Sequence, residues 1–386
     1  MKQVDLVILG AGPAGSAAAV TARRAGLSVA LIDKARFPRD KLCGGLITGR
    51  CAGHLARVFG QEITADLFET RHHFEFYMQG RDLGRLTDVP PLHLTTRRAF
   101  DARLLGHALA AGAEDYTGQR VTRFDPAQNQ VTLDSGATLA FKVLIGADGV
   151  QSPVAKALFG RAFDPARVGF ALEVEAPARP PDEAMPIRID FAAAHWGYGW
   201  SFPKSGSTTV GLGGLHHENP DMNAHLAAYL DLLGVGHDAR VKGHFLPFGE
   251  AKSHPGRANI LLAGDAAGLV DPITGEGIGH AIHSGELAAL AAAHAIATGA
   301  PETALRHYRR ASRPIRRAVA QARWLRPLIF TARLQPFFAR GFANSRRLKH
   351  DYMQLLSGKS DYPDLLWRVV THLPAAILRN IRGKNR

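Results

Sequence analysis

The chain has 386 residues, of which 46% are hydrophobic and 21% are charged, which is typical of a globular protein with a sizeable core. Its only two cysteines, Cys43 and Cys51, are too few for a disulfide framework, a cysteine-rich zinc site or a four-cysteine iron–sulfur cluster. The formal net charge of +13 is unevenly distributed. Residues 301–386 hold 19 Lys and Arg against 4 Asp and Glu, a net charge of +15, and the rest of the chain is close to neutral.

The first residues bear on where the chain resides. The N-terminus leads straight into a strand-like segment, QVDLVILG, without the basic region and separate apolar core of a signal peptide. The sequence contains no uninterrupted run of about 18 apolar residues, so no transmembrane helix is predicted. We therefore expect a cytoplasmic protein in a reducing compartment. The basic C-terminal segment also allows a peripheral position on the inner face of the membrane.

A dinucleotide-binding pattern occupies the N-terminus. The apolar residues 4–9 (VDLVIL) have strand length, and the motif Gly10-Ala-Gly12-Pro-Ala-Gly15 follows, then a helix-like segment and a second strand that ends in Asp33. In this arrangement Gly10 permits a tight turn, Gly12 lets the backbone approach a pyrophosphate, and Gly15 lets the helix lie close to the strand. The Asp33 carboxylate would accept hydrogen bonds from an adenosine ribose and disfavours NADP.

Four further stretches resemble one flavoprotein family. They are residues 37–47 (FPRDKLCGGLI), 95–101 (TTRRAFD), 143–154 (VLIGADGVQSPV) and 260–282 (ILLAGDAAGLVDPITGEGIGHAI). Their order and content are similar to the geranylgeranyl reductase family, within the wider p-hydroxybenzoate hydroxylase-like group of flavoproteins. The resemblance implies an FAD-dependent oxidoreductase.

The resemblance also implies which residues bind FAD. Asp265 would meet the ribityl chain, and backbone N–H groups at Gly277 and Ile278, at a helix N-terminus, would stabilise negative charge on the reduced flavin. Arg97 is the expected flavin-side arginine, with Arg98 as the competing choice. The expected cofactor-binding residues are Gly10, Gly12, Ala14, Gly15, Asp33, Lys34, Arg39, Cys43, Gly44, Gly45, Arg97, Val121, Asp148, Asp265, Gly275, Gly277 and Ile278.

Short strand-like segments fill the middle of the chain, at residues 167–175, 187–192, 196–203 and 207–214. No helical pattern separates them, which predicts an antiparallel sheet. Alternation puts three aromatic side chains on one strand face, namely Tyr198, Trp200 and Phe202. Pattern alone favours a sheet core, but the segment resembles the family's Y-x-W-x-F-P-K signature, which implies the wall of a long apolar pocket.

The residues expected to act on the substrate are Cys43, Tyr198 and Trp200. The Cys43 thiol either donates a proton to a substrate carbon or simply packs, and Cys51 is interpreted as structural. The histidine pairs at 72–73 and 216–217 are adjacent residues without metal-ligand spacing, so no metal is expected.

These features together predict an α/β (α+β overall) fold. It combines a Rossmann-type FAD-binding domain, an antiparallel-sheet substrate domain and a helical C-terminal segment. The expected bounds are 1–75, 95–165 and 255–300 for the FAD-binding domain, 76–94 and 166–254 for the substrate domain, and 301–386 for the basic C-terminal segment.

The C-terminal segment ends in an amphipathic pattern. Its apolar stripe, with basic flanks, is formed by Leu365, Leu366, Val369, Val370 and Leu373. This composition is typical of a helix that lies on anionic lipid. A helical lid over the protein itself and a nucleic-acid-binding face are the alternatives, but no motif of a known nucleic-acid-binding module is present, so no nucleic acid is expected.

The resemblance implies a reductase that adds hydride from reduced flavin, and a proton from Cys43, Tyr198 or water, to an isolated double bond of a polyprenyl or other apolar lipid. Only one G-x-G-x-x-G motif is present. The external reductant is therefore expected to be NAD(P)H that binds transiently, or a reduced carrier such as an electron-donor protein. The alternatives are a monooxygenase or halogenase that acts on an aromatic or apolar substrate, and a flavoprotein that only relays electrons.

Overall fold

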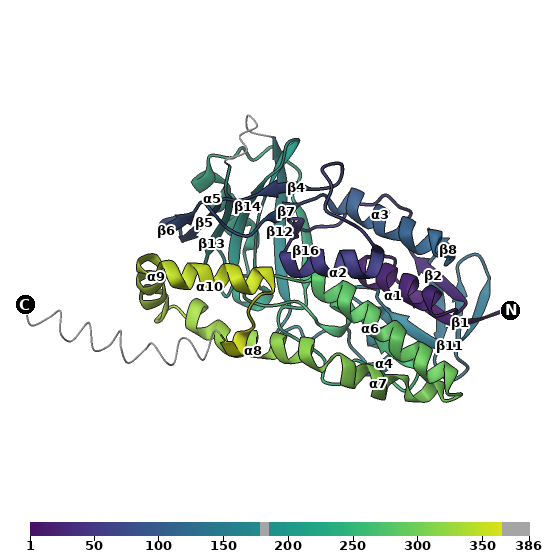
Figure 1. Ribbon diagram of the computed structural model, residues 1–386. Coiled ribbons are helices and arrows are strands. Elements are labelled where there is room, and N and C mark those ends of the chain that lie inside the picture. The colour runs from purple at the N-terminus through teal and green to yellow at the C-terminus, as the bar shows by residue number, and fades with distance from the viewer. Residues whose placement is uncertain (178–184, 365–386) are drawn as a thin grey trace, which may run out of the picture.

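The computed structural model describes residues 1–177 and 185–364. The predicted α/β class is confirmed: in Figure 1 a sheet with helices packed on it lies on the side of the N-terminus, and a second large sheet lies beside it. The amphipathic stripe expected from Leu365 to Leu373 lies outside the described residues.

The first sheet is built around parallel strands in the order β18-β11-β1-β2-β8. Their bounds are Ile260–Leu262, Thr138–Gly146, Lys2–Leu9, Val29–Asp33 and Glu114–Thr117. An antiparallel edge strand, β17 (Gly256–Arg257), and an antiparallel ribbon of β9 (Val121–Asp125) and β10 (Gln130–Leu133) extend this sheet. The carboxyl ends of β1 and β2 thus lie side by side, as nucleotide binding at a parallel sheet requires.

Alternating side chains of β1 bury both faces of this sheet. Leu6 and Ile8 pack in a cluster with helices α1, α2, α3 and α6, whose bounds are Pro13–Arg24, Gly49–Phe59, Arg97–Ala110 and Ile278–Ala297. Val7 and Leu9 pack on the other face, with α4 (Pro153–Phe159) and the β9–β10 ribbon. The sheet is therefore covered on both sides, with α1 and α6 in direct contact.

The second sheet has the order β16-β12-β15-β14-β13-β5-β6. The bounds are Lys242–Leu246, Gly169–Pro177, Ser207–Leu215, Tyr198–Pro203, Ile187–Phe191, Phe74–Met78 and Arg81–Leu86. The four strands expected between residues 167 and 214 pair antiparallel, as predicted, whereas β5, which joins this sheet from an earlier part of the chain, runs parallel to β13 with Phe76 opposite Ile189. These two strands are far apart in the chain, so no hairpin dictates their direction. A small sheet of β3 (Leu46–Ile47), β7 (Leu92–Leu94) and β4 (Glu69–Arg71) lies beside them.

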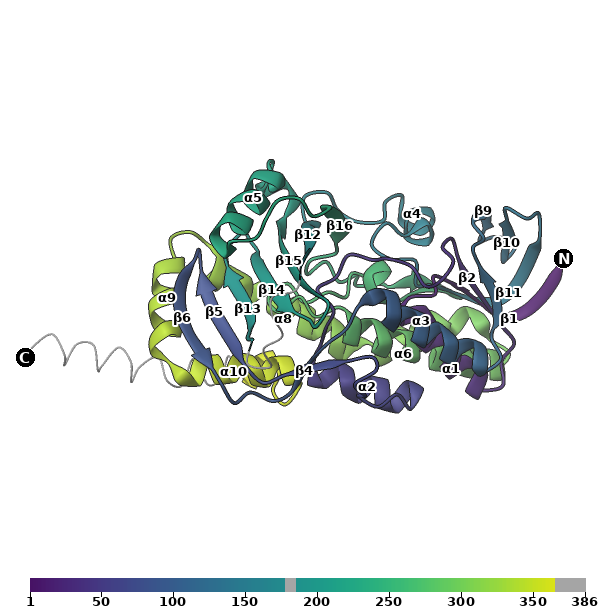
Figure 2. The same cartoon turned by 90° about the horizontal axis from the view of Figure 1, so that it is seen from above.

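Helices cover both faces of the second sheet. Helix α5 (Met222–Leu233) packs on one face. The other face is covered by α8 (Arg313–Phe330), α9 (Gln335–Asn344) and α10 (Arg346–Ser357), as Figure 2 shows, while α7 (Ala304–Ala311) packs on α6. Within the described residues, no helix combines the length and the apolar character needed to cross a membrane.

The contact between α1 and α6 generates a stability prediction. A Cβ added at Gly285 in α6 would lie 2.0 Å from the carbonyl oxygen of Ala14 in α1, so Gly285→Ala should force the helices apart and lower the free energy of unfolding by about 1–3 kcal/mol. The matched control is Gly106→Ala in α3, where an added Cβ meets no atom within 4 Å. This control should stabilise the protein by about 0.5–1 kcal/mol. Urea denaturation of both variants measures the difference, and equal effects would contradict the close packing.

Candidate active site

A cavity of about 670 Å³ lies between the two large sheets. It is lined by the expected site residues from every motif, with one exception. Gly15 lies behind the wall, in α1, where an added Cβ would approach the carbonyl oxygen of Gly10 to 1.7 Å. Gly15 therefore shapes the first turn of the nucleotide motif from behind and does not border the cavity.

The first strand–helix turn is fixed by Asp33. One carboxylate oxygen accepts a hydrogen bond from the backbone N–H of Ala11 and the other from that of Ala35, both at 2.8 Å. Helix α1 then begins behind Gly12 without a side-chain cap. Its first N–H groups are left for another acceptor, as a phosphate-binding helix N-terminus requires.

Asp148 supplies a polar atom that has no partner within the described protein. Its Oδ2 accepts from the backbone N–H of Val154 at 3.2 Å, whereas its Oδ1 is buried without a hydrogen-bond partner. Burial raises the pKa of Asp148 to about 6. An orphaned acceptor on the cavity wall matches the hydroxyl groups of a dinucleotide.

The turn 271–277 carries the N-terminus of α6 to the cavity. The Asp271 carboxylate accepts from the backbone N–H groups of Ile273 and Thr274, at 2.8 and 2.9 Å, and from the Tyr362 hydroxyl at 2.6 Å. Helix α6 begins at Ile278 behind Gly277, again without a side-chain cap. Asp265 lines the cavity beside this helix end.

The loop that contains Cys43 is held from the second sheet. The backbone N–H of Cys43 donates to Oε1 of Glu173 at 3.0 Å, and the Cys43 thiol accepts from the backbone N–H of Gly45 at 3.4 Å. Gly45 has a φ of +79°, and an added Cβ would lie 1.9 Å from the carbonyl oxygen of Thr95. The loop therefore presents the Cys43 thiol to the cavity from a fixed backbone.

Tyr198, Trp200 and Phe202 all lie on the cavity side of β14. Trp200 is opposite Gly211 of β15, where an added Cβ would lie 2.5 Å from the indole. The bare glycine thus gives the indole room to lie over the neighbouring strand. An added Cβ at Gly275 would lie 1.8 Å from the hydroxyl oxygen of Tyr198, which puts this hydroxyl against the turn that opens α6.

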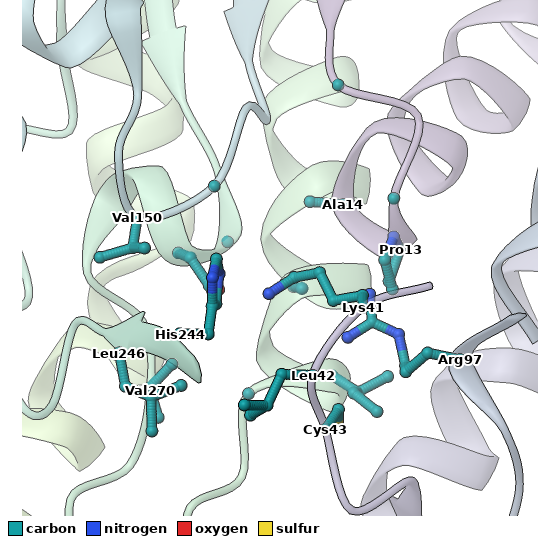
Figure 3. Close-up of a pocket in the computed structure, with 18 of the residues that line it drawn as sticks. Pro13, Ala14, Lys41, Leu42, Cys43, Arg97, Val150, His244, Leu246 and Val270 are labelled. Atoms are coloured by element: carbon teal, nitrogen blue, oxygen red, sulfur yellow. The ribbon is translucent and has the colours of Figure 1, made fainter. Parts of the chain in front are cut away.

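Cationic side chains gather at the same cavity. Arg97 is buried and donates through Nε and Nη2 to the two oxygens of Asp101, both at 2.7 Å, and Arg39 lies 3.1 Å from Asp101. Arg98 is exposed, so the structure favours Arg97 among the two candidates. Figure 3 shows the amine of Lys41 reaching into the cavity beside Arg97.

His244, Leu246 and Val270 line the wall opposite Lys41 (Figure 3). Burial and the nearby cations, Lys41 first among them, lower the pKa of His244 to about 3, so its imidazole is neutral. Burial also lowers the pKa of Lys41, although Asp265 opposes that effect. Neither side chain was predicted as a site residue from the sequence. Lys41 lies within residues 37–47, but no role was assigned to it there, and His244 lies on a strand that carries no motif.

Other residues at the cavity were also identified only from the structure. Glu173, Asp271, Tyr352 and Leu356 either line the cavity or hold its walls, and all four are brought there by long-range packing. Cys51, interpreted as structural, is buried and also borders the cavity. No group of histidine, cysteine or carboxylate side chains in the described part of the chain could hold a metal ion.

Together these residues fit a bound FAD. Two helix ends without side-chain caps, at Gly12 and Gly277, face one cavity with bare glycine backbone around them. Arg39, Lys41 and Arg97 add positive charge that suits the pyrophosphate and a reduced flavin.

The sequence is similar to that of known flavoproteins. The family model described as "FAD dependent oxidoreductase" matches residues 5–134. The chain is 32% identical over 312 residues to the menaquinone reductase of Mycolicibacterium smegmatis, a match that covers 74% of this chain and 76% of the relative. It is 31% identical over 318 residues to the digeranylgeranylglycerophospholipid reductase of Methanosarcina mazei, with 76% of each chain covered.

Solved structures share the fold. A geranylgeranyl bacteriochlorophyll reductase-like protein from Thermoplasma acidophilum has a TM-score of 0.73 at 20% identity, with 92% of each chain covered. A flavin-dependent brominase has a TM-score of 0.71 at 21% identity, covering 92% of this chain and 94% of that one. The architecture is therefore common to reductases and halogenases, and the fold alone does not select the reaction.

The buried Glu173 carboxylate generates a pH prediction. Burial raises its pKa from 4.5 to about 7, so the folded protein holds a proton that the unfolded chain releases between these values. Stability should therefore fall as pH rises from about 4.5 to about 7, by about 3 kcal/mol for this group. Glu173→Gln keeps an acceptor for Cys43 and removes the titration.

Urea denaturation at pH 5 and pH 8 should show that wild type loses more stability than the Glu173→Gln variant as the pH rises. Parallel losses in the two proteins would contradict the raised pKa of Glu173.

Proposed function

This chain belongs to the geranylgeranyl reductase family of FAD-dependent oxidoreductases, and we propose that it reduces isolated carbon–carbon double bonds in the polyprenyl chain of a lipid. The relatives' names point to a shared substrate element, because a geranylgeranyl group and the tail of a menaquinone are both polyprenyl chains. The observation that carries the proposal is an apolar chamber, walled by the aromatic face of β14, that adjoins the turn 271–277.

The chamber has the composition that a polyprenyl chain needs. Its walls come from different elements and include Phe74, Ile189, Tyr198, Trp200, Phe202, Leu246, Tyr352 and Leu356. Aromatic side chains offer a large contact area and lose little rotamer freedom when a ligand packs against them. The same apolar wall excludes water from the place where the double bond would lie.

The polar groups at the edge of this chamber suit proton delivery. When bound, reduced FAD supplies a hydride to one alkene carbon, and a proton is needed at the other carbon. Burial and the nearby Asp271 raise the pKa of Tyr198, so its hydroxyl stays protonated at neutral pH and can donate. Cys43 lines the same cavity and is the second candidate donor, with water as the third.

Each reduced double bond consumes two electrons, which an external reductant must return to the flavin. We propose NAD(P)H or a reduced carrier protein for this role, because the single G-x-G-x-x-G motif is already used by the FAD site. The cations Arg39 and Lys41 at the cavity suit the negative charge of either donor.

A direct test is anaerobic incubation of the FAD-loaded protein with excess dithionite and geranylgeranyl diphosphate, or a menaquinone, dispersed in detergent. After any quinol has been reoxidised in air, mass spectrometry should find products heavier by two hydrogens for each reduced carbon–carbon double bond. Trp200→Ala should raise KM for the polyprenyl substrate about tenfold, because a buried aromatic contact is lost, and should leave the FAD content unchanged.

The matched control is Phe170→Ala, which removes an aromatic side chain from the opposite face of the same sheet. It should change KM far less than Trp200→Ala. Absence of any saturated product, together with a hydroxylated or halogenated aromatic product in a parallel aerobic incubation with an aromatic substrate, would establish the monooxygenase or halogenase alternative. Rapid quinone reduction without alkene reduction would establish an electron relay.

A further inference from the structure

Large apolar side chains are exposed where α8 passes into α9. Trp324 is 80% exposed, Leu328 52%, Leu334 37% and Phe337 75%. Trp324 and Leu328 are four residues apart on α8 and therefore share one helix face. Leu334 lies in the connection to α9, and Phe337 lies in the first turn of α9. We name this cluster of four side chains the α8–α9 patch.

The patch is additional to the apolar faces that these helices bury. Phe330 of α8 is buried in the core. Phe338 and Phe342 of α9 pack on Phe191, with ring centroids 5.4 and 5.7 Å apart. Phe337 and Phe338 are neighbours in sequence, yet one is largely exposed and the other packs inward. These four side chains are thus exposed although other apolar side chains of the same helices pack in the core, and a group of exposed large apolar side chains marks a candidate interaction site.

The chain segment that carries the patch has charge of one sign. Residues 303–350 contain 12 Arg and one Lys, and no Asp or Glu. Arg323, Arg333 and Arg340 are exposed and alternate along the chain with the apolar side chains of the patch. A partner that covers this surface must offer both an apolar phase and negative charge.

We propose that the α8–α9 patch docks on the surface of an anionic lipid bilayer. Indole and phenyl rings enter the boundary between headgroups and acyl chains, and arginines beside them pair with lipid phosphates. The long arginine side chains can cover apolar surface while keeping their guanidinium groups in the headgroup region. Trp324 and Phe337 are thus the inserted side chains, and Arg323, Arg333 and Arg340 supply the charge.

The location of the patch connects it to the chamber. Figure 2 shows α9 and α10 at the end of the molecule away from the N-terminus. Phe342 of α9 lies with its ring centroid 6.5 Å from that of Tyr352, and Tyr352 of α10 lines the cavity. Helix α9, which carries part of the patch, therefore packs on helix α10, which lines the cavity. This link to substrate supply rests on the proposed function, but the docking itself does not.

Sedimentation of the full-length, FAD-loaded protein with vesicles tests the docking. Vesicles of phosphatidylcholine alone are compared with vesicles that contain one quarter phosphatidylglycerol. Wild type should bind the anionic vesicles at least about tenfold more tightly, and added salt should weaken this binding. Trp324→Ala/Phe337→Ala and Arg323→Glu/Arg333→Glu/Arg340→Glu should each weaken it at least about tenfold.

The control variant is Phe159→Ala/Leu290→Ala, which removes exposed apolar side chains outside the patch and should bind like wild type. Circular dichroism and FAD content confirm that each variant is folded. Equal binding of wild type to both vesicle types, or full binding by the Trp324→Ala/Phe337→Ala variant, would overturn the proposal.

Two alternatives to lipid docking by the α8–α9 patch would give different experimental results. A wild-type dimer that Trp324→Ala/Phe337→Ala converts to a monomer in sedimentation velocity would assign the patch to a second copy of the chain and overturn lipid docking. Vesicle binding that is lost on deletion of residues 365–386, but is unaffected by substitutions in the patch, would also overturn it.

The docking and the proposed function fail in different ways. A Trp324→Ala/Phe337→Ala variant that binds vesicles weakly, yet reduces a detergent-dispersed polyprenyl lipid like wild type, supports both. A wild type that binds anionic vesicles through the patch, and reduces no polyprenyl lipid, leaves the docking in place and removes the proposed function.

Discussion

The cavity depends on the carboxylate of Asp271. It holds the turn 271–277 through backbone N–H groups of Ile273 and Thr274, and it also receives the hydroxyl of Tyr362 from the C-terminal segment. That turn sets where α6 begins and brings Gly275 against the Tyr198 hydroxyl. One buried carboxylate thus connects the nucleotide-binding sheet, the aromatic strand and the C-terminal helices. Asp271 is itself almost fully buried, so its hydrogen bonds are made where water cannot replace them.

The two parts of the cavity on either side of this turn differ in the polarity of the residues that line them. The part beside the first sheet offers uncapped helix N-termini and the cations Arg39 and Lys41, which favour phosphate groups and negative charge. The part beside the second sheet is apolar and aromatic. Glu173 links the two parts by holding the backbone of Cys43. A flavin between them would meet fixed charge on one side and a water-excluding chamber on the other, which is the arrangement that a hydride transfer to an unactivated alkene requires.

The sequence alone predicted features that depend on near neighbours. The unit from Gly10 to Asp33 and the shared face of Tyr198 and Trp200 follow from turn chemistry and strand alternation. The start of α6 behind Gly277 was implied by the family resemblance. Distant partners were not predictable. Tyr362 and Asp271 are 91 residues apart, and Cys43 and Glu173 are 130 apart, so nothing in a local pattern pairs them. The parallel pairing of β5 with β13 was missed for the same reason.

The central claim is that the aromatic face of β14 holds a polyprenyl chain beside the flavin. A crystal structure of the FAD-loaded protein with a geranylgeranyl lipid bound tests this most directly. We expect the lipid chain to lie against Tyr198, Trp200 and Phe202, with one double bond at the end of the chamber that Cys43 and Gly275 border. A lipid chain bound elsewhere, with the β14 aromatics packed together and no space between them and the flavin, would contradict the claim.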